Sequence, residues 1–576
     1  ARMRELAKEK ILIKRYEELT PDQQKFAKKY FDTALFPIIT PIAVDQSRPF
    51  PVLPSRAMAL AVGLTRYDKA YLAIVNIPRN VPRLVKLPSE AGETALIMTD
   101  ELVRNNLEKL FKGYKTAGAS LFRLIRDSEI EVDEEFEPDL LKAIDSEIKK
   151  RPRAKVVYLE VEKNCVPEIA EFLSQELAFP AEAITRIDNR EMDLTYLFGL
   201  ASQTARPDLM YRSFTPEAIG YENIFDKIKE NNFVIHVPFQ SFAPTVDLVR
   251  TAASDPAVLA IKMTLYRTND GSAIIGALKE AAKKGKQVTV LVEIKARFDE
   301  ERNIGWAKEL EEAGCHVMYG IAGMKIHSKI TLVVRKENGS IARYVHLSTG
   351  NYNEKTAEIY TDIGFFTASD DFAKDISEVF NVITGFSQPS RWKRIVSSPH
   401  DLREYFFELI DREIENQKKN KSGMLFAKMN SLEDTKMIEK LYEASRAGVK
   451  IKLIIRGICC LVPGVPGMSE NIEVRSVVGR FLEHTRIFTF NNNGQPRVFL
   501  SSADWMTRNL DRRIELLFEL YRDELKTEMC SLLELYWKDN VKSRILASDG
   551  SYTRAKKTDK EEKVNAQEIL IGRYSK

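Results

Sequence analysis

Hydrophobic positions in residues 1–213 follow two different periods in no regular order. Alternating or nearly continuous apolar runs predict strands at 56–64, 69–77 and 155–162. Apolar residues three or four positions apart predict helices at 18–35, 102–111 and 166–177. Strands and helices in mixed order are typical of an α+β domain, and we expect that fold for this region.

From residue 214 onward the hydrophobic pattern alternates between buried strands and amphipathic helices. The predicted order is strand 256–266, helix 272–285, strand 287–297, helix 303–314 and strand 316–321. Both helices end at a glycine, which is a common helix terminator. Such alternation predicts βαβ units and a largely parallel sheet, so the fold class is α/β.

The same pattern recurs later in the chain. Residues 280–297 match 443–460 in their Glu, Ala and Gly positions and in the phase of the apolar strand. Residues 348–366 match 501–519, and in that register Asp362 falls on Glu515. Between the two matches, "GMKIHSK" and "FLEHTRI" each place a histidine two residues before a cation. Three matches in the same order predict two homologous domains.

Length and composition fit several domains. At roughly 150 residues per domain, 576 residues predict three or four, and we divide the chain into 1–213, 214–394 and 395–576. No segment approaches the roughly 18 apolar residues of a membrane span. Five cysteines without metal-ligand spacing predict reduced thiols in a cytoplasmic protein. A net charge of +4 does not demand nucleic acid, but it allows basic clefts for a polyanion.

The candidate chemistry lies in the two histidine–cation steps, His327/Lys329 and His484/Arg486. Side chains two positions apart on a strand share one face. A neutral imidazole is a good nucleophile near neutral pH, and a neighbouring cation would hold phosphate oxygens. Two buried structural histidines are the alternative, which the duplicated frame disfavours.

The aligned carboxylates, Asp362 and Glu515, complete the candidate site. A carboxylate bound to the second ring nitrogen would fix the tautomer of each imidazole and stabilise its charged form. Which carboxylate serves which histidine stays open. The sequence has no P-loop, no protein-kinase glycine-rich loop and no H-E-x-x-H motif.

Paired half-sites in tandem βα domains resemble the phospholipase D superfamily. A narrower resemblance, to bacterial-type polyphosphate kinases, runs through both repeats in the order "LAIKMTLYRT", "VEIKARFDEERNIGWAKELEEAG", "GMKIHSKITLVVR", "YVHLSTGNYNEKTAEIYTDIGFFT", "RGICCLVPGVPG", "FLEHTRIF" and "VFLSSADWMTRNLDRRIE". It implies two tandem phospholipase D-like α/β domains after an α+β head domain at 1–213. The family also has an N-terminal helical domain, which we expect to be missing ahead of residue 1.

The resemblance implies an ATP:polyphosphate phosphotransferase that transfers the γ-phosphate reversibly through a phosphohistidine. His327 matches the phosphorylated histidine, and His484 the second histidine, with an acid–base or phosphate-contact role. Arg456 matches a nucleotide-phosphate contact and Tyr360 an aromatic that packs on adenine. A supporting role for His346 is also implied, with a purely structural histidine as the alternative.

Arg267 and Arg297 match positions that the family associates with Mg²⁺. A guanidinium offers a cation no lone pair, so we expect indirect contacts and a Mg²⁺ ion held by substrate phosphates and water. The expected partners are ATP, ADP and inorganic polyphosphate, without nucleic acid. The resemblance also implies a homodimer or homotetramer and allows peripheral association with the inner face of the membrane.

Two other functions remain as alternatives. A phospholipase D-like phosphodiesterase also uses a histidine nucleophile, but it normally shows H-x-K-x4-D in both repeats, and that aspartate is lacking here. A non-catalytic polyphosphate-binding scaffold would not need both histidines. The C-terminal segment 541–576 holds nine Lys and Arg against five Asp and Glu; we expect a solvated basic tail, with the lining of a polyphosphate path as the alternative.

Overall fold

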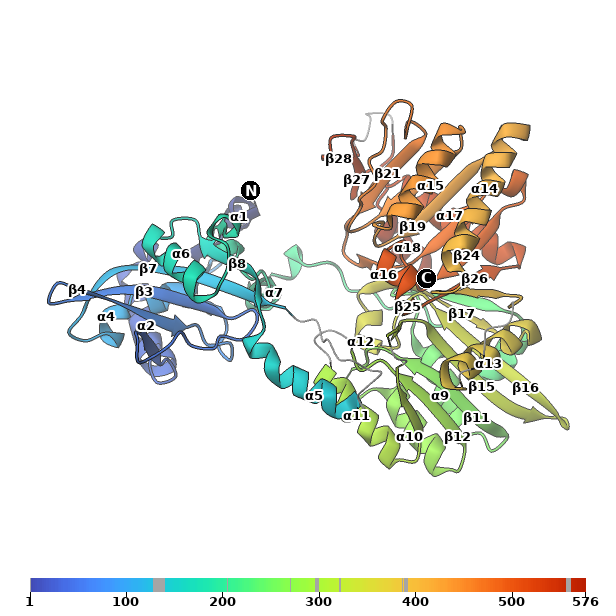
Figure 1. The fold of residues 1–576 in the computed structure, drawn as a ribbon, viewed down its shortest axis with the longest axis horizontal. Coiled ribbons are helices and arrows are strands. Elements are labelled where there is room, and N and C mark those ends of the chain that lie inside the picture. The colour runs from blue at the N-terminus through green and yellow to red at the C-terminus, as the bar shows by residue number, and fades with distance from the viewer. Residues whose placement is uncertain are drawn as a thin grey trace. The chain divides into compact units, whose positions relative to one another are not determined.

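A computed structural model of the chain describes residues 2–127, 140–204, 206–269, 271–295, 300–320, 323–385, 387, 392–555 and 561–575. It forms two compact units, a smaller one from most of residues 1–212 and a larger one that takes 213–576 (Figure 1).

The smaller unit contains a six-stranded sheet in the order β2-β4-β3-β7-β8-β9 and a three-stranded sheet in the order β1-β6-β5. Its strands are β1 (Ile11–Lys14), β2 (Pro41–Val44), β3 (Met58–Arg66), β4 (Lys69–Asn76), β5 (Leu84–Lys86), β6 (Thr94–Met98), β7 (Lys115–Arg126), β8 (Val156–Glu162) and β9 (Thr185–Ile187). Its α-helices are α1 (Arg2–Lys8), α2 (Pro21–Tyr30), α3 (Thr99–Arg104), α4 (Leu107–Leu110), α5 (Leu140–Lys150), α6 (Pro167–Glu176) and α7 (Tyr196–Thr204).

The helix predicted at 102–111 is interrupted. Helix α3 ends before Asn105, and α4 begins at Leu107. The side-chain amides of Asn105 and Asn106 donate to the carbonyls of Glu101 and Leu102, at 2.9 Å each. Asparagine side chains compete in this way for backbone hydrogen bonds, which explains the break inside an apolar helical pattern.

The first half of the larger unit is a mixed sheet in the order β10-β17-β16-β15-β11-β12-β13, with β22 paired to β17. Its elements are α8 (Ile224–Glu230), β10 (Phe233–Val237), α9 (Ala243–Ser254), β11 (Val258–Leu265), α10 (Ala273–Lys283), β12 (Gln287–Val292), α11 (Glu300–Glu312), β13 (His316–Tyr319), β14 (Lys325–Ile326), β15 (Lys329–Glu337), β16 (Ser340–Ser348), α12 (Glu354–Ala357), β17 (Tyr360–Thr367) and α13 (Asp370–Gly385).

The second half repeats this plan in a nine-stranded sheet, β18-β26-β24-β23-β19-β20-β21-β27-β28. Its elements are β18 (Ile395–Ser397), α14 (Leu402–Asn420), β19 (Met424–Met429), α15 (Thr435–Arg446), β20 (Lys450–Ile455), β21 (Ile472–Val477), β22 (Leu482–Glu483), β23 (Ile487–Phe490), β24 (Arg497–Ser501), α16 (Thr507–Asp511), β25 (Arg513–Ile514), β26 (Leu516–Leu520), α17 (Asp523–Trp537), β27 (Ser543–Leu546), β28 (Tyr552–Arg554) and α18 (Ala566–Tyr574).

Only part of each sheet is parallel, so the prediction of a largely parallel sheet is wrong. Strands β11, β12 and β13 are parallel, as are β19, β20 and β21. Strands β15 and β16 instead form an antiparallel hairpin. Its turn is Asn338–Gly339, with φ of 45° and 83°, and an Asn-Gly pair with positive φ at both positions favours a tight hairpin over a crossover.

One hydrophobic core joins the two halves of the larger unit. Phe365 of β17 stacks on Phe518 of β26, with ring centroids 5.8 Å apart, and both rings belong to a cluster that draws on both sheets. Helix α18 contributes Ala566 and Leu570, both fully buried. The tail is therefore not simply solvated, because β27 and β28 extend the sheet and α18 completes the core.

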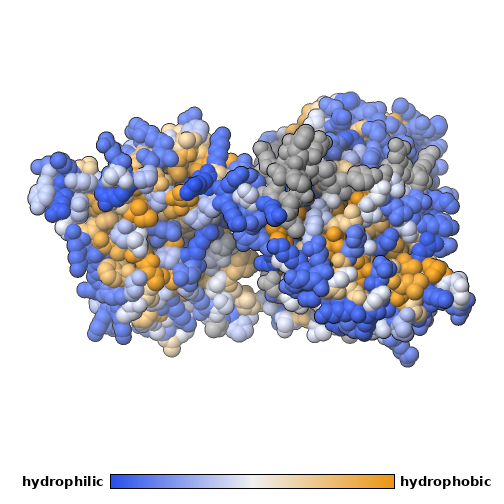
Figure 2. Space-filling view, turned by 60° about the horizontal axis from the view of Figure 1, so that its bottom comes forward, coloured by the Kyte–Doolittle hydropathy of each residue, from blue (hydrophilic) through white to orange (hydrophobic). Residues whose placement is uncertain are grey.

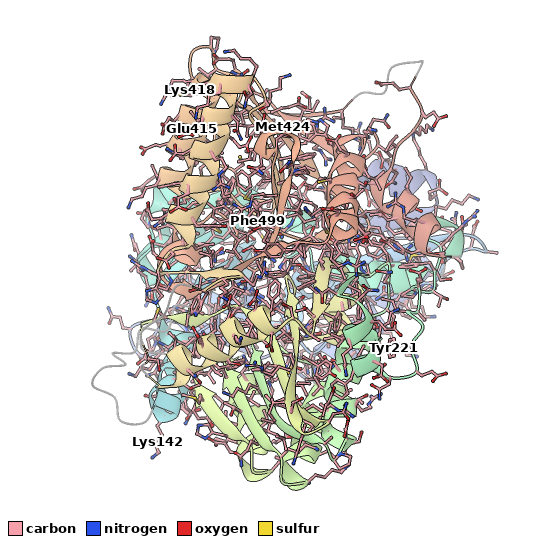
Figure 3. All side chains as sticks on the ribbon, turned by 90° about the vertical axis from the view of Figure 1, so that its right-hand side faces the viewer. Lys142, Tyr221, Glu415, Lys418, Met424 and Phe499 are labelled. Carbon is pink, nitrogen blue, oxygen red and sulfur yellow. The ribbon has the colours of Figure 1, made fainter. Side chains whose placement is uncertain are left out.

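Polar and apolar side chains separate in the expected way. Figure 3 shows Phe499 inside the second half of the unit, whereas Glu415 and Lys418 project outward from α14. Hydrophilic residues cover much of the face in Figure 2, with smaller hydrophobic groups between them. Among the described helices, none is long and apolar enough to cross a membrane.

Candidate active site

Two short parallel strand pairs connect the two halves of the larger unit and position both histidines. Strand β14 pairs with β25, in the register Ile326 to Ile514. Strand β17 pairs with β22, in the register Thr361 to Glu483. In the first pair, His327 follows β14, and Glu515 of the other half follows β25. In the second pair, His484 follows β22, and Asp362 of the other half lies on β17. The pairing is therefore reciprocal.

His327 is held by the second half. Its Nδ1 lies 2.8 Å from the carboxylate of Glu515, and its backbone N–H donates to the carbonyl of Ile514 at 3.0 Å. The hydroxyl of Ser502 donates to the same carboxylate at 2.6 Å. Glu515 is fully buried and His327 is 8% exposed, so the imidazole has one fixed nitrogen, and Nε2 is the nitrogen left for chemistry.

His484 is held by the first half in the same way. Its Nδ1 lies 2.8 Å from Oδ2 of Asp362. The hydroxyl of Thr349 donates to Oδ1 of that carboxylate at 2.6 Å, and the backbone N–H of His484 donates to the hydroxyl of Thr361 at 3.1 Å. The question that the sequence left open is thus answered, since each carboxylate bonds the histidine of the other half.

The two cations of the histidine–cation steps are buried between these groups. The ammonium of Lys329 donates to the carbonyl of His327. The guanidinium of Arg486 donates to the carbonyl of Thr349 at 3.0 Å and to Asp504 at 3.1 Å. Its Nη1 lies 3.1 to 3.2 Å from both ring nitrogens of His484. Such equal distances place Nη1 over the ring face, where it disfavours protonation of the imidazole.

Burial governs the titration of the site. Burial, with the Lys329 ammonium nearby, holds the pKa of His327 well below its ordinary value, and burial with Arg486 lowers that of His484. Burial raises the pKa of Glu515 to about 7 and lowers that of Lys329 to about 7. Both imidazoles are therefore neutral at neutral pH, which is the form that a nucleophile requires.

Further predicted residues cluster around His484. The ring of Tyr360 lies 5.3 Å from that imidazole, at 60°. Arg456 follows β20, donates through Nε to the carbonyl of Glu483 at 3.1 Å and reaches Asn430 at 2.9 Å. Both residues therefore border the second half-site.

The two arginines associated with Mg²⁺ lie in the first half. Arg267 follows β11, with its guanidinium 5.3 Å from the ring of Tyr266. That ring meets His327 edge-on at 4.9 Å. Arg297 lies outside the described residues. Within the described parts of the chain, no group of three or more His, Cys, Asp or Glu side chains could hold a metal ion. These residues therefore do not fit a protein cage for Mg²⁺.

Sequence reasoning missed several groups that shape the site. Asp504 neutralises Arg486, and Tyr266 flanks His327. The two residues whose hydroxyls donate to these carboxylates are Thr349 and Ser502. They occupy equivalent positions in "LSTG" and "LSSA". This hydroxyl match directly after the end of β16 and of β24 is the signal that could have found them.

Comparison with known proteins places the whole chain in one group. Residues 22–200 match the family model described as polyphosphate kinase middle domain. Residues 223–389 match polyphosphate kinase C-terminal domain 1, and residues 395–567 match polyphosphate kinase C-terminal domain 2.

Individual relatives agree over nearly the full chain. A polyphosphate kinase of Bacillus anthracis is 46% identical over 551 residues, 93% of this chain and 78% of that protein. A polyphosphate kinase of Thermosynechococcus vestitus is 40% identical over 607 residues, 99% and 83%. The crystal structure of polyphosphate kinase from Porphyromonas gingivalis superposes with a TM-score of 0.84 at 30% identity, covering 99% of this chain and 86% of that one.

Proposed function

Because this chain belongs to the polyphosphate kinase family, and is thus a transferase that acts on ATP and polyphosphate, we propose that it transfers phosphate through a covalent phosphohistidine on His327. The observation that carries the proposal is the hydrogen bond between Nδ1 of His327 and the carboxylate of Glu515, at 2.8 Å. A ring held at Nδ1 presents Nε2 as its nucleophile.

In the first step, Nε2 of His327 attacks the γ-phosphorus of ATP. A nitrogen–phosphorus bond forms as the bond from that phosphorus to the β–γ bridging oxygen breaks, and ADP leaves. The imidazole becomes positively charged, and Glu515 stabilises that charge through Nδ1–H. Phosphoryl transfer depends mainly on such positioning and charge neutralisation.

In the second step, a terminal oxygen of polyphosphate attacks the phosphorus and the bond to Nε2 breaks. His327 returns to its neutral form, and the polyphosphate chain is longer by one phosphate. The reverse sequence would return ATP from polyphosphate and ADP. His484 serves the transferred or leaving oxygens from the opposite side, with Asp362 fixing its tautomer. The cations Lys329, Arg486 and Arg456 are suited to phosphate oxygens.

Magnesium stays a prediction. An ion bound to the triphosphate would offset part of its charge, held by substrate oxygens and water. Lys329 and Arg456 would then contact the remaining oxygens. The homo-oligomer and the peripheral membrane association that the family resemblance implies likewise remain proposals.

Labelling with γ-³²P-ATP and Mg²⁺ tests the covalent step. We expect an acid-labile, base-stable protein phosphate that His327→Ala abolishes. His316→Ala is the matched control, because His316 is an exposed histidine in the same half, and we expect it to label like the wild type.

Two outcomes would contradict the proposal. Undiminished labelling of His327→Ala would move the phosphate to another residue. Polyphosphate synthesis without any protein label, under conditions that trap the intermediate, would favour direct transfer from ATP. The phospholipase D-like phosphodiesterase is not favoured by the comparisons, and hydrolysis of a phosphodiester without labelling would be needed to restore it.

A further inference from the structure

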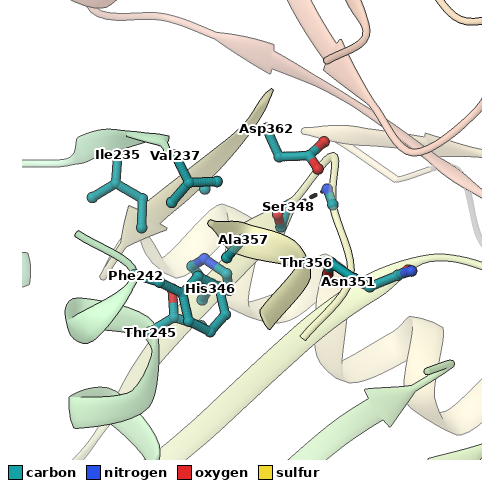
Figure 4. Close-up of a pocket in the computed structure, with 12 residues that line it drawn as sticks. Ile235, Val237, Phe242, Thr245, His346, Ser348, Asn351, Thr356, Ala357 and Asp362 are labelled. Atoms are coloured by element: carbon teal, nitrogen blue, oxygen red, sulfur yellow. Dashed lines mark hydrogen bonds between the residues drawn. The ribbon is translucent and has the colours of Figure 1, made fainter. Parts of the chain in front are cut away.

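A small enclosed cavity lies behind Asp362, on the side of that residue away from the second half. Figure 4 shows its walls, with Asp362 and His346 on neighbouring strands, Phe242 just before helix α9 and Thr245 in its first turn. Its volume of about 10 Å³ leaves room for the centre of about one water molecule. The register of the strands fixes this arrangement, since His346 pairs with Phe366 and therefore stands two pairs away from Gly364, on the same face of the sheet.

Buried polar atoms line this cavity without partners. Nε2 of His346 and the hydroxyl of Thr245 have no hydrogen-bond partner among the described residues, although each side chain is only 1% exposed. Oδ1 of Asn351, in another lining residue, is a third such atom. A buried polar group without a hydrogen bond costs roughly 1–3 kcal/mol, so several around one water-sized space point to a bound water.

The other nitrogen of His346 is already committed. Nδ1 lies 2.9 Å from the hydroxyl of Tyr352, and burial lowers the pKa of His346 to about 3. The imidazole is therefore neutral, with one nitrogen a donor and the other an acceptor. Water can donate or accept, so it satisfies Nε2 in either tautomer.

The duplicated half supplies an internal comparison. In the register that aligns Asp362 with Glu515, Phe499 stands for His346 and Leu517 for Gly364. Both substitutes are buried in an apolar cluster, and Figure 3 shows Phe499 inside that half. The fold itself therefore accepts apolar side chains at these positions. The polar cavity is particular to the first half, whose Asp362 contacts His484.

The glycines around the cavity keep this space open. A Cβ atom on Gly364 would lie 2.7 Å from Nε2 of His346, and one on Gly350 would lie 2.2 Å from Oδ2 of Asp362. Neither distance is compatible with a real side chain. The backbone therefore approaches both polar groups closely, which only glycine allows.

We propose that this cavity holds a buried water that links His346 and Thr245 to the carboxylate of Asp362, and that His346 and Thr245 are thereby positioning residues for His484. The inference rests on the role proposed above for His484. Water that donates to the carboxylate favours its ionised form, and an ionised Asp362 keeps Nδ1 of His484 protonated and Nε2 facing the substrate.

The test is the pH dependence of kcat for polyphosphate synthesis in the full chain. Thr245→Val removes only the hydroxyl at constant shape. It should move the more acidic inflection of the profile, which lies below the one set by Glu515, upward by about one pH unit, because a carboxylate that loses a hydrogen bond is protonated at higher pH. His346→Phe, the side chain used by the other half, should cause the same shift with a kcat roughly tenfold lower.

Thr489→Val is the matched control. Thr489 is a buried threonine of β23 whose hydroxyl donates to the carbonyl of Phe426 at 3.0 Å, away from the cavity, and its loss should leave the pH profile unchanged. A crystal structure at a resolution that shows ordered waters should reveal one within hydrogen-bond distance of His346 and Thr245.

The outcomes separate this inference from the proposed function. Full turnover in His484→Ala would overturn the role of His484 and the inference with it. An inactive His484→Ala beside an unshifted profile in both Thr245→Val and His346→Phe would overturn the water link alone. A dry cavity in the crystal structure would do the same.

Discussion

At the scale of single residues, burial brings together the pKa values of two groups beside His327, the carboxyl of Glu515 and the ammonium of Lys329. Glu515 and Lys329 both have a pKa of about 7, although their ordinary values lie about six units apart. Both residues contact His327, and each acts electrostatically on the other. A coupled pair of this kind titrates as a unit.

This coupling predicts that two kinetic parameters rise together with pH, the rate of labelling and the apparent KM for ATP. As pH rises through about 7, Glu515 becomes ionised and can stabilise the imidazolium, so the rate of His327 labelling at saturating ATP should rise. Lys329 loses its proton in the same range, so the apparent KM for ATP should rise too. Single-turnover labelling between about pH 6 and pH 8 measures both.

Glu515→Gln isolates the carboxylate. We expect the labelling rate to fall roughly 100-fold or more, because an amide neither fixes the tautomer nor stabilises the imidazolium, and its rise with pH to disappear. Glu473→Gln, an exposed glutamate of β21, should behave like the wild type. A Glu515→Gln variant with the wild-type pH dependence would remove Glu515 from the mechanism.

At the scale of elements, helix α18 is the C-terminal support of the second half-site. The side chain of Gln567 accepts from the N–H of Phe481 and donates to its carbonyl, both at 2.9 Å, and donates to Glu483 at 2.6 Å. Glu483 forms a buried ion pair with Lys428 at 2.9 Å. Helix α18 therefore holds Phe481 and Glu483, which precede His484 in the chain.

Gln567→Leu should lower polyphosphate synthesis about tenfold, because the buried backbone groups of Phe481 lose their partner and the His484 loop loses its support. The same variant should unfold at a lower temperature. Glu568→Gln, which changes an exposed side chain of the same helix, should alter neither quantity. Wild-type synthesis rates in Gln567→Leu would show that the loop does not depend on α18.

Elements were predictable where the spacing of apolar residues is regular. Apolar runs predicted β3, β4 and β8, and helical spacing predicted α6, each to within about two residues, since the hydrophobic pattern reports burial directly. It missed the antiparallel hairpin of β15 and β16, which depends on the Asn338–Gly339 turn. It also mistook the tail, because α18 is short and its partners lie far away in sequence.

The site was predictable only as far as the repeat reached. Alignment of the halves brought Asp362 and Glu515 to equivalent positions beside a histidine. It could not show that each carboxylate crosses to the other half, because a pairing between copies leaves no trace in the spacing within one copy. Asp504 and Tyr266 escaped notice for a related reason, since their counterparts differ chemically. Asn351 aligns with Asp504, and Asn430 follows β19 where Tyr266 follows β11.

At the scale of the molecule, the two phospholipase D-like halves share one core while the head region forms a unit of its own. The fold class predicted from the sequence is confirmed by the match to the Porphyromonas gingivalis structure. Phe365 and Phe518 stack across the two halves, so these halves should unfold together. The head unit has separate hydrophobic clusters.

Calorimetry should therefore show two unfolding transitions. ATP should raise only the transition of the larger unit, by about 3 °C at 100 times its dissociation constant. Phe365→Ala should lower the free energy of unfolding of the larger unit by roughly 3–5 kcal/mol, the cost of truncating a buried aromatic side chain. Its transition should therefore move to a lower temperature, while the transition of the head unit stays in place. A single transition that responds to both changes would contradict this division.

The crossed carboxylates carry a consequence for how such an enzyme could have arisen. One copy of the repeat, taken alone, would have a histidine without a carboxylate at Nδ1 and a carboxylate without a histidine to bind. Two identical copies facing each other about a twofold axis would cure both defects at once, so an ancestor with one copy would have acted only as a pair. Once the copies were fused, each was free to diverge, as the exchange of Tyr360 for Arg513 and of Lys329 for Arg486 at matching positions illustrates.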